Sequence, residues 1–310
     1  MSSINIASAK SRISPHFKET PCFSIAALND ELGCNILLKA EFLTPIKAFK
    51  IRGAFNFVLK NHKEIGSGGI ITHSSGNHGQ ALAYVGLKLN IPVTVVVPKN
   101  APKIKVDAMK KWKASIAFSG NTTIEREQLC EELANKKNAL IIPPYNHLDI
   151  IEGQGTATLE LIDKQDLDAI FCPIGGGGLT AGAAVAIKEC GARASLYACE
   201  PEMAADAYNG FKAGIRQIQQ SVDYTIADGL RTTVGELNFP IIKDGVSRVL
   251  LCNEEEIMAW GRKMLVDYNL LIEPSSAVVF ACLAKHKDEF QGKKLGLIIS
   301  GGNVDPKFYF

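Results

Sequence analysis

The chain has 310 residues, of which 46% are hydrophobic and 21% are charged. This is the composition of an ordinary globular protein, and it excludes a disordered or fibrous chain. The length predicts two domains, because one domain usually takes about 100–200 residues. A formal net charge of +2 argues against a nucleic-acid partner.

The cellular compartment is suggested by the N-terminus and the cysteines. The first thirteen residues are polar and lack the apolar stretch of a secretory signal. Residues 169–187 carry no charge, but Pro173 and a run of glycines favour a strand, a turn and a buried helix over a membrane span. The eight cysteines contain no C-x-x-C pair, and most lie in apolar runs, which is typical of reduced thiols. We therefore expect a cytoplasmic protein with no membrane partner.

From residue 69 onward, short β-branched runs alternate with amphipathic stretches. The runs at 70–72, 93–97, 115–118 and 139–142 are predicted strands, and the stretches at 79–88, 102–111 and 123–135 are predicted helices. This alternation predicts a parallel sheet that is covered on both faces. A second alternating series runs through 169–174, 179–190, 195–199, 248–252, 254–267, 277–285 and 294–300. The predicted fold class is therefore α/β, in two lobes with a ligand site in the cleft between them.

Four consecutive glycines follow the predicted strand at 169–174 and precede a predicted helix; they are Gly175, Gly176, Gly177 and Gly178. Glycine lets the backbone approach an anion closely, and the helix N-terminus adds a favourable dipole, so the segment predicts a phosphate site. A tight turn without a ligand is the alternative. Residues 176–181 also match G-x-G-x-x-A, and Glu200 ends the next predicted strand. On this segment alone a nicotinamide dinucleotide stays open.

Three further segments carry polar side chains at places where ligands bind. Residues 73–79 follow a predicted strand, open a helix and could seat a carboxylate. Lys50 lies in a largely apolar segment, where desolvation would lower its pKa and make it a nucleophile or base. Ser300 ends the last predicted strand, at the edge where α/β proteins bind ligands. Taken singly, each also fits a plain structural role: a helix cap, a surface lysine and a strand end.

Taken together and in this order, these segments resemble the pyridoxal-phosphate enzymes of fold type II, and in particular the threonine dehydratase and serine racemase family. The resemblance runs from about residue 20 to residue 305. It is carried by Phe-Lys-Ile-Arg-Gly-Ala at 49–54, Thr-His-Ser-Ser-Gly-Asn-His-Gly-Gln at 72–80, Gly-Gln-Gly-Thr at 153–156, the four glycines, Ile-Ala-Asp-Gly at 226–229, Ile-Glu-Pro at 272–274 and Ser-Gly-Gly-Asn at 300–303.

The resemblance implies an architecture and a cofactor. The fold would be similar to that of the tryptophan synthase β subunit, with parallel-rich twisted sheets. A large cofactor-binding domain would comprise residues 1–60 and 147–310, and a small domain residues 61–146. The phosphate on the glycines would then belong to pyridoxal 5′-phosphate and not to a dinucleotide. Only residues 304–310 follow the last motif, so we expect no C-terminal regulatory domain and no isoleucine feedback.

The resemblance also implies roles for individual residues. Lys50 would form the Schiff base with the cofactor and then move the α-proton, and Ser75 would act on the opposite face. The cofactor would further be bound by Phe49 against its ring, Asn77 at its 3′-oxygen, Ser300 at its pyridine nitrogen, and Gly175, Gly176, Gly177, Gly178 and Leu179. The substrate would be bound by Ser74, Ser75, Asn77, His78 and Arg126. A cation site for Mg²⁺, Ca²⁺ or Mn²⁺ would comprise Glu200, Ala204 and Asp206.

The reaction follows from the residue at the pyridine nitrogen. A serine there, in place of a carboxylate, leaves the nitrogen mostly unprotonated, so the ring is a weaker electron sink and suits β-elimination. The resemblance implies an ammonia-lyase that converts L-threonine or L-serine to 2-oxobutanoate or pyruvate plus ammonia, and that acts as a homodimer. Racemisation of serine and dehydration of threo-3-hydroxyaspartate on the same site are the alternatives, besides a binding protein without activity. The sequence departs from the family at Ile46-Lys47-Ala48, where Thr-Gly-Ser is usual, and at 143–147.

Overall fold

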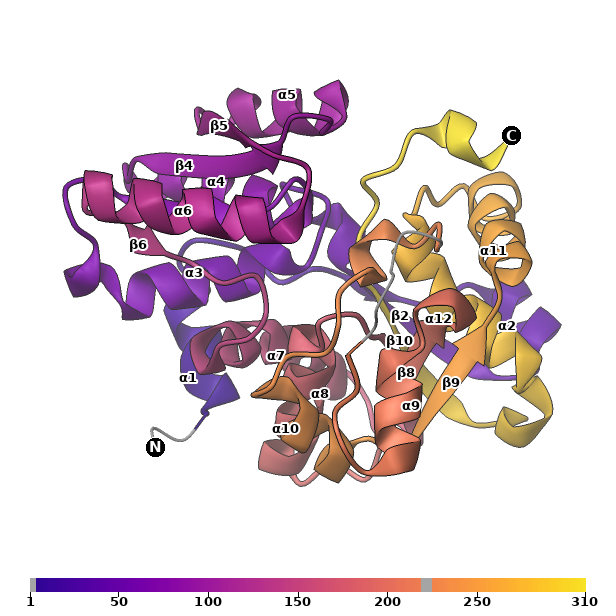
Figure 1. Ribbon diagram of the computed structural model, residues 1–310. Coiled ribbons are helices and arrows are strands. Elements are labelled where there is room, and N and C mark those ends of the chain that lie inside the picture. Colours follow the sequence, from indigo (N-terminus) through magenta and orange to yellow (C-terminus); the bar gives the residue numbers. More distant parts are fainter. Residues whose placement is uncertain (1–3, 219–224) are drawn as a thin grey trace. The chain divides into compact units, whose positions relative to one another are not determined.

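The computed structural model describes residues 4–218 and 225–310, and the chain divides into two compact units. Unit 1 comprises residues 1–49 and 145–310, and unit 2 comprises residues 50–144. Figure 1 labels most of their helices and strands. The sequence analysis assigned 50–60 to the larger domain. In the structure this segment is α3 (Lys50–Lys60), which packs on α4 (Asn77–Leu89) and belongs to unit 2.

Unit 2 is built on a parallel sheet with the strand order β5-β4-β3-β6. All four strands agree with the predicted runs to within a residue or two: β3 (Ile70–His73), β4 (Val93–Pro98), β5 (Ser115–Ser119) and β6 (Leu140–Ile141). Besides α3 and α4, the unit contains α5 (Lys103–Lys111) and α6 (Thr123–Lys137). Helix α6 packs through Cys130 and Ala134 on the sheet residues Ile71 and Val96. Its N-terminus has a capping box in which Thr122 and Glu125 bond each other's backbone N–H groups.

Unit 1 is built on a second sheet, with the strand order β1-β2-β10-β7-β8-β9, in which only β1 is antiparallel to its neighbour. Its strands are β1 (Cys22–Phe23), β2 (Asn35–Ala40), β7 (Ala169–Pro173), β8 (Ser195–Pro201), β9 (Arg248–Cys252) and β10 (Lys294–Ile299). Its helices are α1 (Ile6–Ile13), α2 (Ala26–Leu32), α7 (Leu148–Ile162), α8 (Gly178–Cys190), α9 (Asp206–Ala213), α10 (Asn238–Gly245), α11 (Glu254–Val266) and α12 (Pro274–Lys285).

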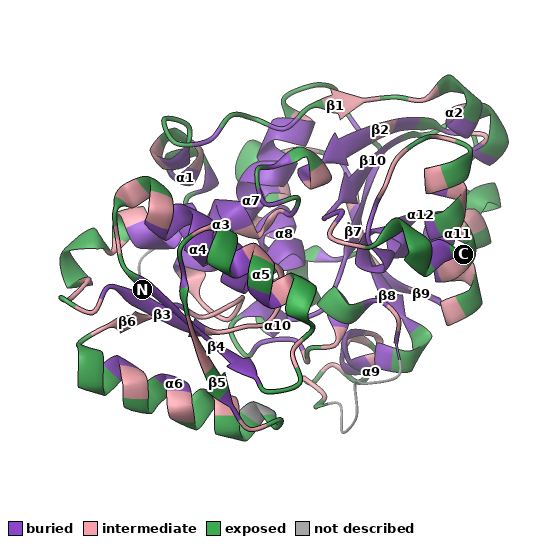
Figure 2. Cartoon of the chain, turned by 90° about the horizontal axis from the view of Figure 1, so that it is seen from above, coloured by how far each residue is buried: buried purple, intermediate pink, exposed green. Residues whose placement is uncertain are grey.

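The sheet of unit 1 is buried on both faces, as expected for parallel strands. In β7, Phe171 packs in one apolar cluster with Phe280 of α12. Its neighbours in the strand, Ile170 and Cys172, pack in a second cluster with residues of α7, α8 and α10. Figure 2 shows the buried colour running along β7, β10 and α12. The prediction of a mixed α/β fold with parallel-rich sheets is confirmed. Within the described ranges, no helix is long and apolar enough to cross a membrane.

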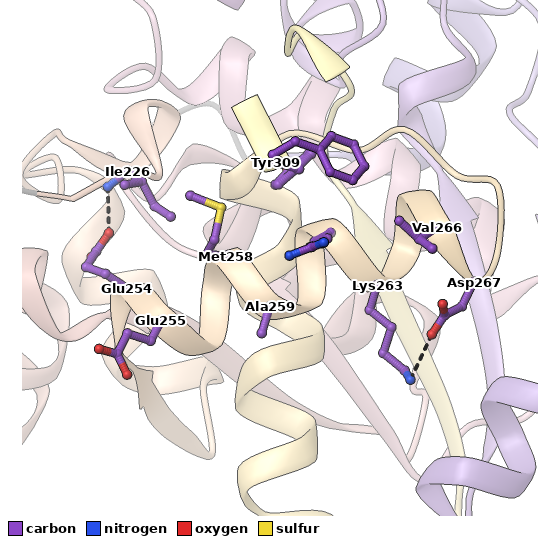
Figure 3. A pocket seen from close by; sticks show the side chains of 11 residues that line it. Ile226, Glu254, Glu255, Met258, Ala259, Lys263, Val266, Asp267 and Tyr309 are labelled. Carbon is purple, nitrogen blue, oxygen red and sulfur yellow. Dashed lines mark hydrogen bonds and ion pairs between the residues drawn. The ribbon is translucent and has the colours of Figure 1, made fainter. Parts of the chain in front are cut away.

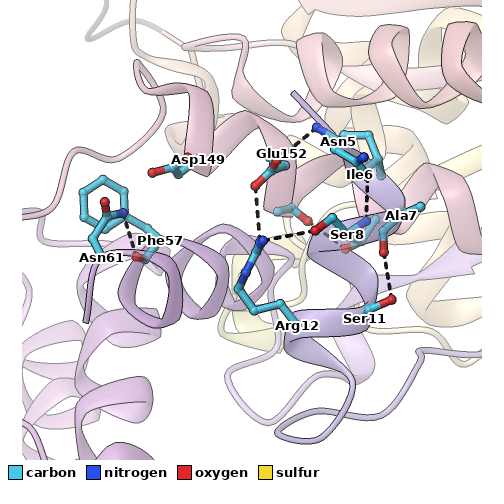
Figure 4. A network of polar contacts seen from close by, with 12 residues as sticks. Asn5, Ile6, Ala7, Ser8, Ser11, Arg12, Phe57, Asn61, Asp149 and Glu152 are labelled. Atoms are coloured by element: carbon cyan, nitrogen blue, oxygen red, sulfur yellow. Dashed lines mark hydrogen bonds and ion pairs between the residues drawn. The ribbon is translucent and has the colours of Figure 1, made fainter. Parts of the chain in front are cut away.

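Helix α1, which the sequence analysis did not predict, is fixed on α7 by a buried carboxylate. Glu152 accepts the backbone N–H of Asn5 through Oε1 at 3.0 Å and pairs with Nη1 of Arg12 through Oε2 at 3.3 Å. A second guanidinium nitrogen of Arg12 reaches the hydroxyl of Ser8 at 3.2 Å (Figure 4). The side chain of Glu152 is only 3% exposed and that of Arg12 is 25% exposed, so water reaches this pair from the guanidinium side alone.

Candidate active site

The glycine-rich loop joins β7 to α8 in unit 1, and three of its positions exclude a side chain. Gly177 is the N-cap of α8 and has a φ of 85°, a left-handed conformation that favours glycine. A Cβ on Gly176 would lie 2.5 Å from the ring of Tyr145, and one on Gly175 would lie 2.8 Å from the Cα of Leu230. The N–H groups of the loop and of the first turn of α8 can therefore meet an anion with no side chain between them.

The side chain of Leu179 does not take part in this anion site. It is 4% exposed and packs in the apolar cluster of α7, α8 and α10. Any contact between Leu179 and a cofactor would therefore come from its backbone N–H in the first turn of α8, where N–H groups have no partner within the helix.

Ser300 directly follows β10, and β10 is the parallel neighbour of β7. The carboxyl ends of these strands meet at one edge of the sheet, so Ser300 and the glycine loop lie at the same edge. The hydroxyl of Ser300 is 2.9 Å from that of Ser276, and either can be the donor. Ser276 has one hydroxyl hydrogen, and the carbonyl of Gly301 at 2.8 Å is a second acceptor for it. Ser300 keeps its own hydrogen for a ring nitrogen only when Ser276 turns its hydrogen from Gly301 to Ser300. The carbonyl of Ser300 accepts the N–H of the half-buried Phe49 at 2.9 Å, which brings Phe49 to this edge too.

Lys50 begins α3 of unit 2, immediately after Phe49. Its side chain is half-buried, and its Nζ donates to the carbonyl of Pro144 at 2.9 Å. Ile142, two residues before Pro144, contacts His78: its carbonyl oxygen lies 3.2 Å from Nε2 of His78. Burial, followed by the positive charge of Lys50, lowers the pKa of His78 to about 3. Unit 2 therefore brings Lys50 close to the start of α4.

The turn before α4 contains most of the predicted substrate ligands. Ser74, Ser75 and Asn77 are half-buried, and the hydroxyl of Ser74 accepts the N–H of Gly76 at 3.3 Å. His78 differs from them, because its ring is 3% exposed and neutral. The Ile142 carbonyl takes its one N–H, and among the described residues Nδ1 has no hydrogen-bond partner. The His78 side chain has no donor left for a carboxylate, so such a contact would come from its backbone N–H at the N-terminus of α4.

Arg126 lies half-buried in α6. Burial lowers the pKa of His73 at the end of β3, and the charge of Arg126 acts in the same direction. Arg126 is therefore within electrostatic range of the turn that begins at His73. Its predicted place beside the substrate stays a prediction.

Glu200 and Asp206, two of the three predicted cation ligands, are buried at the end of β8 and the start of α9 in unit 1. Glu200 accepts the N–H groups of Ala207 at 2.9 Å and Tyr208 at 2.8 Å, and Asp206 accepts that of Val234 at 2.8 Å. Burial raises the pKa of Asp206 to about 6. Burial and the charge of Asp206 raise the pKa of Glu200 well above its usual range.

The third predicted ligand, Ala204, is buried in the turn Glu202–Ala204 and could offer only a carbonyl. In the described part of the chain, no group of three or more His, Cys, Asp or Glu side chains is arranged to hold a metal ion. The cation site therefore stays a prediction that rests on two carboxylates with raised pKa values.

Two residues at the glycine loop were not singled out from the sequence. Tyr145 lies against Gly176, and Asn238 donates from Nδ2 to the carbonyl of Gly176. Neither residue belongs to a glycine, serine or lysine motif, and Asn238 is 62 positions away from its partner. No pattern in the local sequence marks them, because their role depends on which distant carbonyl they meet.

A cavity of about 820 Å³ lies elsewhere in unit 1, along the outer side of α11 and the C-terminal residues Tyr309 and Phe310 (Figure 3). Met258 and Val266 give it an apolar lining, which charged side chains such as Lys263 border. None of the predicted site residues lines it. Its size alone therefore does not make it the candidate active site.

Comparison with known proteins identifies relatives that are similar over nearly the whole chain. The curated relatives include L-threo-3-hydroxyaspartate ammonia-lyase of Saccharomyces cerevisiae, which is 38% identical over 98% of this chain and 94% of its own. Serine racemase of Dictyostelium discoideum is 39% identical over 97% of this chain and 94% of its own. Both cover nearly the whole length, so the similarity is not confined to one unit.

Solved structures extend the likeness to the fold. The crystal structure of serine racemase from Dictyostelium discoideum matches with a TM-score of 0.90 at 39% identity, and that of a threonine deaminase from T.th. with a TM-score of 0.91 at 33% identity. Each match covers 97% of both chains. The family described as pyridoxal-phosphate dependent enzyme matches residues 13–301. The chain therefore belongs to the pyridoxal-phosphate dependent enzymes, in the fold type II group that includes serine racemases, threonine deaminases and hydroxyaspartate ammonia-lyases.

Proposed function

We propose that this protein is an ammonia-lyase that eliminates the β-hydroxyl of L-threonine and L-serine as water. The resulting aminocrotonate or aminoacrylate is then hydrolysed by one water to 2-oxobutanoate or pyruvate plus ammonia. One observation carries the proposal: the ligand edge of unit 1 ends in the buried hydroxyl pair Ser300–Ser276. A neutral hydroxyl can donate to an unprotonated pyridine nitrogen, which keeps the ring a moderate electron sink and favours expulsion of a β-substituent.

The residues at this edge fit pyridoxal phosphate. The loop of Gly175, Gly176 and Gly177 admits no Cβ and would offer its N–H groups to the phosphate. Phe49 would pack on the ring, and Ser300 would face the ring nitrogen. Bound pyridoxal phosphate supplies an electron sink that makes the α-hydrogen of an amino acid acidic.

The residues of unit 2 would supply the remaining chemistry. Lys50, whose Nζ the Pro144 carbonyl holds in a defined position, would take the α-proton as the β-hydroxyl is expelled. Asn77 would bond the 3′-oxygen. Ser74 and the first N–H groups of α4 would bind the substrate carboxylate, which the positive end of the helix dipole favours. His78 keeps its neutral ring, so it orients this turn through the Ile142 carbonyl and does not compete for the proton.

An assay of ammonia and 2-oxo acid formation from L-serine, L-threonine and L-threo-3-hydroxyaspartate tests the proposal. Lys50→Ala should abolish both turnover and the visible absorption band that borohydride bleaches, because no other amine would hold the cofactor. Lys47→Ala is the matched control: this lysine is three residues away and exposed, and its variant should keep both signals. A Lys50→Ala protein that turns over substrate, or a Lys47→Ala protein that does not, would contradict the assignment.

Serine racemisation is a second candidate, because a relative of that name is 39% identical and Ser75 stands in the turn before α4. Ser75 would return the proton to the face opposite Lys50. Chiral analysis in the same assay separates the two activities. If the enzyme racemises serine, Ser75→Ala should lose D-serine formation and retain pyruvate formation. If Ser75→Ala loses both equally, the two-face role of Ser75 is wrong.

We also propose that Glu200, Asp206 and the carbonyl of Ala204 bind Mg²⁺, Ca²⁺ or Mn²⁺. Two buried carboxylates whose pKa values are raised gain from a divalent cation, which removes their mutual repulsion. Added Mg²⁺ should then raise the melting temperature of the wild type and leave that of Asp206→Asn unchanged. An equal rise in both proteins would place the cation elsewhere.

A further inference from the structure

The carbonyl of Gly176 in the glycine loop is held by two donors from one short segment. The backbone N–H of Gly235 donates to it at 3.1 Å, and Nδ2 of Asn238 donates to it as well. Asn238 is the first residue of α10 and is fully buried. Both hydrogen bonds therefore fix the peptide between Gly176 and Gly177, and Gly177 is the N-cap of α8.

This fastening fixes the direction of a neighbouring donor. A trans peptide is planar, so its carbonyl and the N–H of the next residue point in opposite directions. With the carbonyl of Gly176 turned toward α10, the N–H of Gly177 is turned away from α10. The φ of 85° at Gly177 shows that the loop needs an uncommon backbone conformation at this point. Glycine also gains the most conformational freedom when it is released, so an unfastened loop would not keep this N–H aimed.

The hydrogen bonding of Asn238 indicates that its amide does more than stabilise the fold. Its Nδ2 faces two acceptors, the carbonyls of Gly176 and, at 3.4 Å, Tyr145, so the amide cannot be turned over. As a result Oδ1 is buried without a hydrogen-bond partner in the described part of the chain, which costs free energy. An apolar side chain would avoid that cost, and the surroundings, Ile242 and Val234, are apolar.

We propose that Asn238 is a positioning residue of the phosphate site: it holds the carbonyl of Gly176 so that the N–H of Gly177 is presented to the phosphate of the cofactor. The inference rests on the proposed placement of that phosphate on the glycine loop. It assigns Asn238 no contact with the cofactor and no part in proton transfer. Its effect is therefore on phosphate binding, and it does not extend to the ring or the substrate.

The test compares two ligands of the apoprotein, pyridoxal phosphate and pyridoxal, which lacks the phosphate. Asn238→Leu keeps the branching at Cγ, with somewhat larger volume, and removes the donor; Asn238→Ala removes the donor without adding volume. Asn238→Leu should weaken pyridoxal phosphate about 10- to 100-fold, the loss expected for one charge-assisted hydrogen bond, and leave the affinity for pyridoxal unchanged. Asn238→Ala should show the same selective loss, and Asn238→Thr, which restores a hydroxyl donor, should recover part of it. Asn209→Leu, the same change at an exposed position of α9, is the control.

The outcomes separate the inference from the proposed function. Equal weakening of both ligands by all three substitutions means that Asn238 supports the fold and not the phosphate, and it overturns the inference alone. An unchanged affinity for pyridoxal phosphate in Asn238→Leu and Asn238→Ala overturns it as well. If the wild type binds pyridoxal as tightly as pyridoxal phosphate, the phosphate is not on this loop. The proposed placement and the role of Asn238 then fail together. The ³¹P resonance of the holoenzyme should shift in Asn238→Leu and stay in place in Asn209→Leu.

Discussion

The buried ring of His78 ties the stability of unit 2 to pH. Its pKa is about 3 in the folded protein, because of burial and the charge of Lys50, against an ordinary value of 6.5. Between these values the unfolded chain binds a proton that the folded protein does not. The stabilisation is therefore complete above pH 6.5 and is lost as the pH falls, with a limiting slope of about 1.4 kcal/mol per pH unit.

We predict that His78→Gln removes this dependence. Between pH 7 and pH 5 the wild type should lose roughly 2 kcal/mol more unfolding free energy than the variant, because glutamine does not titrate and its amide can still donate to the Ile142 carbonyl. Urea unfolding at both pH values measures the difference. His16→Gln replaces an exposed histidine and should behave as the wild type does. Identical pH dependence in wild type and His78→Gln would show that the ring titrates freely.

His78 also shows what residue types leave undecided. The segment 73–79 predicts a carboxylate seat from its composition, and the structure places Ser74 and Asn77, both half-buried, at the N-terminus of α4. The one ring N–H of His78 bonds the carbonyl of Ile142, which is 64 positions away in the sequence. That contact depends on how the strands of unit 2 pair. A motif identifies the residues of a site, whereas their remaining donors and acceptors depend on tertiary contacts.

At the scale of elements, the sequence predicted best the strands that are buried on both faces. The apolar run at 93–97 became β4 (Val93–Pro98), and the run at 169–174 became β7, because parallel central strands are short and continuously apolar. Strand β2 was not predicted, since Lys39 interrupts its apolar run. In the structure Lys39 is fully buried and pairs with Glu160, 121 positions away, and with the carbonyl of Thr20. No local pattern shows such a partner.

Helix α7 was missed for a different reason, the glycines at 153 and 155, which are poor helix formers. Their presence is explained by the packing of α7 on α8. A Cβ on Gly155 would lie 2.7 Å from the carbonyl of Gly182 in α8, and a Cβ on Gly182 would lie 2.5 Å from the N of Gly155. The two helices thus approach backbone to backbone. Propensity alone cannot predict this, because the gain comes from the partner helix.

At the scale of the whole molecule, the reactivity of the cysteines measures how often the folded core opens. Six of the eight are buried, Cys22 is half-buried, and Cys190 at the end of α8 is exposed. Burial and the charges of Asp163 and Glu189 raise the pKa of Cys190, so its thiol is accessible without being unusually reactive. The buried thiols can meet a reagent only when the surrounding core opens.

We therefore predict that a thiol reagent such as 5,5′-dithiobis(2-nitrobenzoic acid) reacts with the folded protein in a fast phase of one thiol, which Cys190→Ser removes. In urea, where the chain is unfolded, all eight cysteine thiols should react. Because a ligand that binds only the folded state lowers the population of open forms, pyridoxal phosphate should slow the reaction of the buried thiols and leave that of Cys190 unchanged. Stopped-flow absorbance follows both phases. If pyridoxal phosphate does not change the reaction rate of the buried thiols, the reagent reaches these cysteines through local openings that cofactor binding does not suppress.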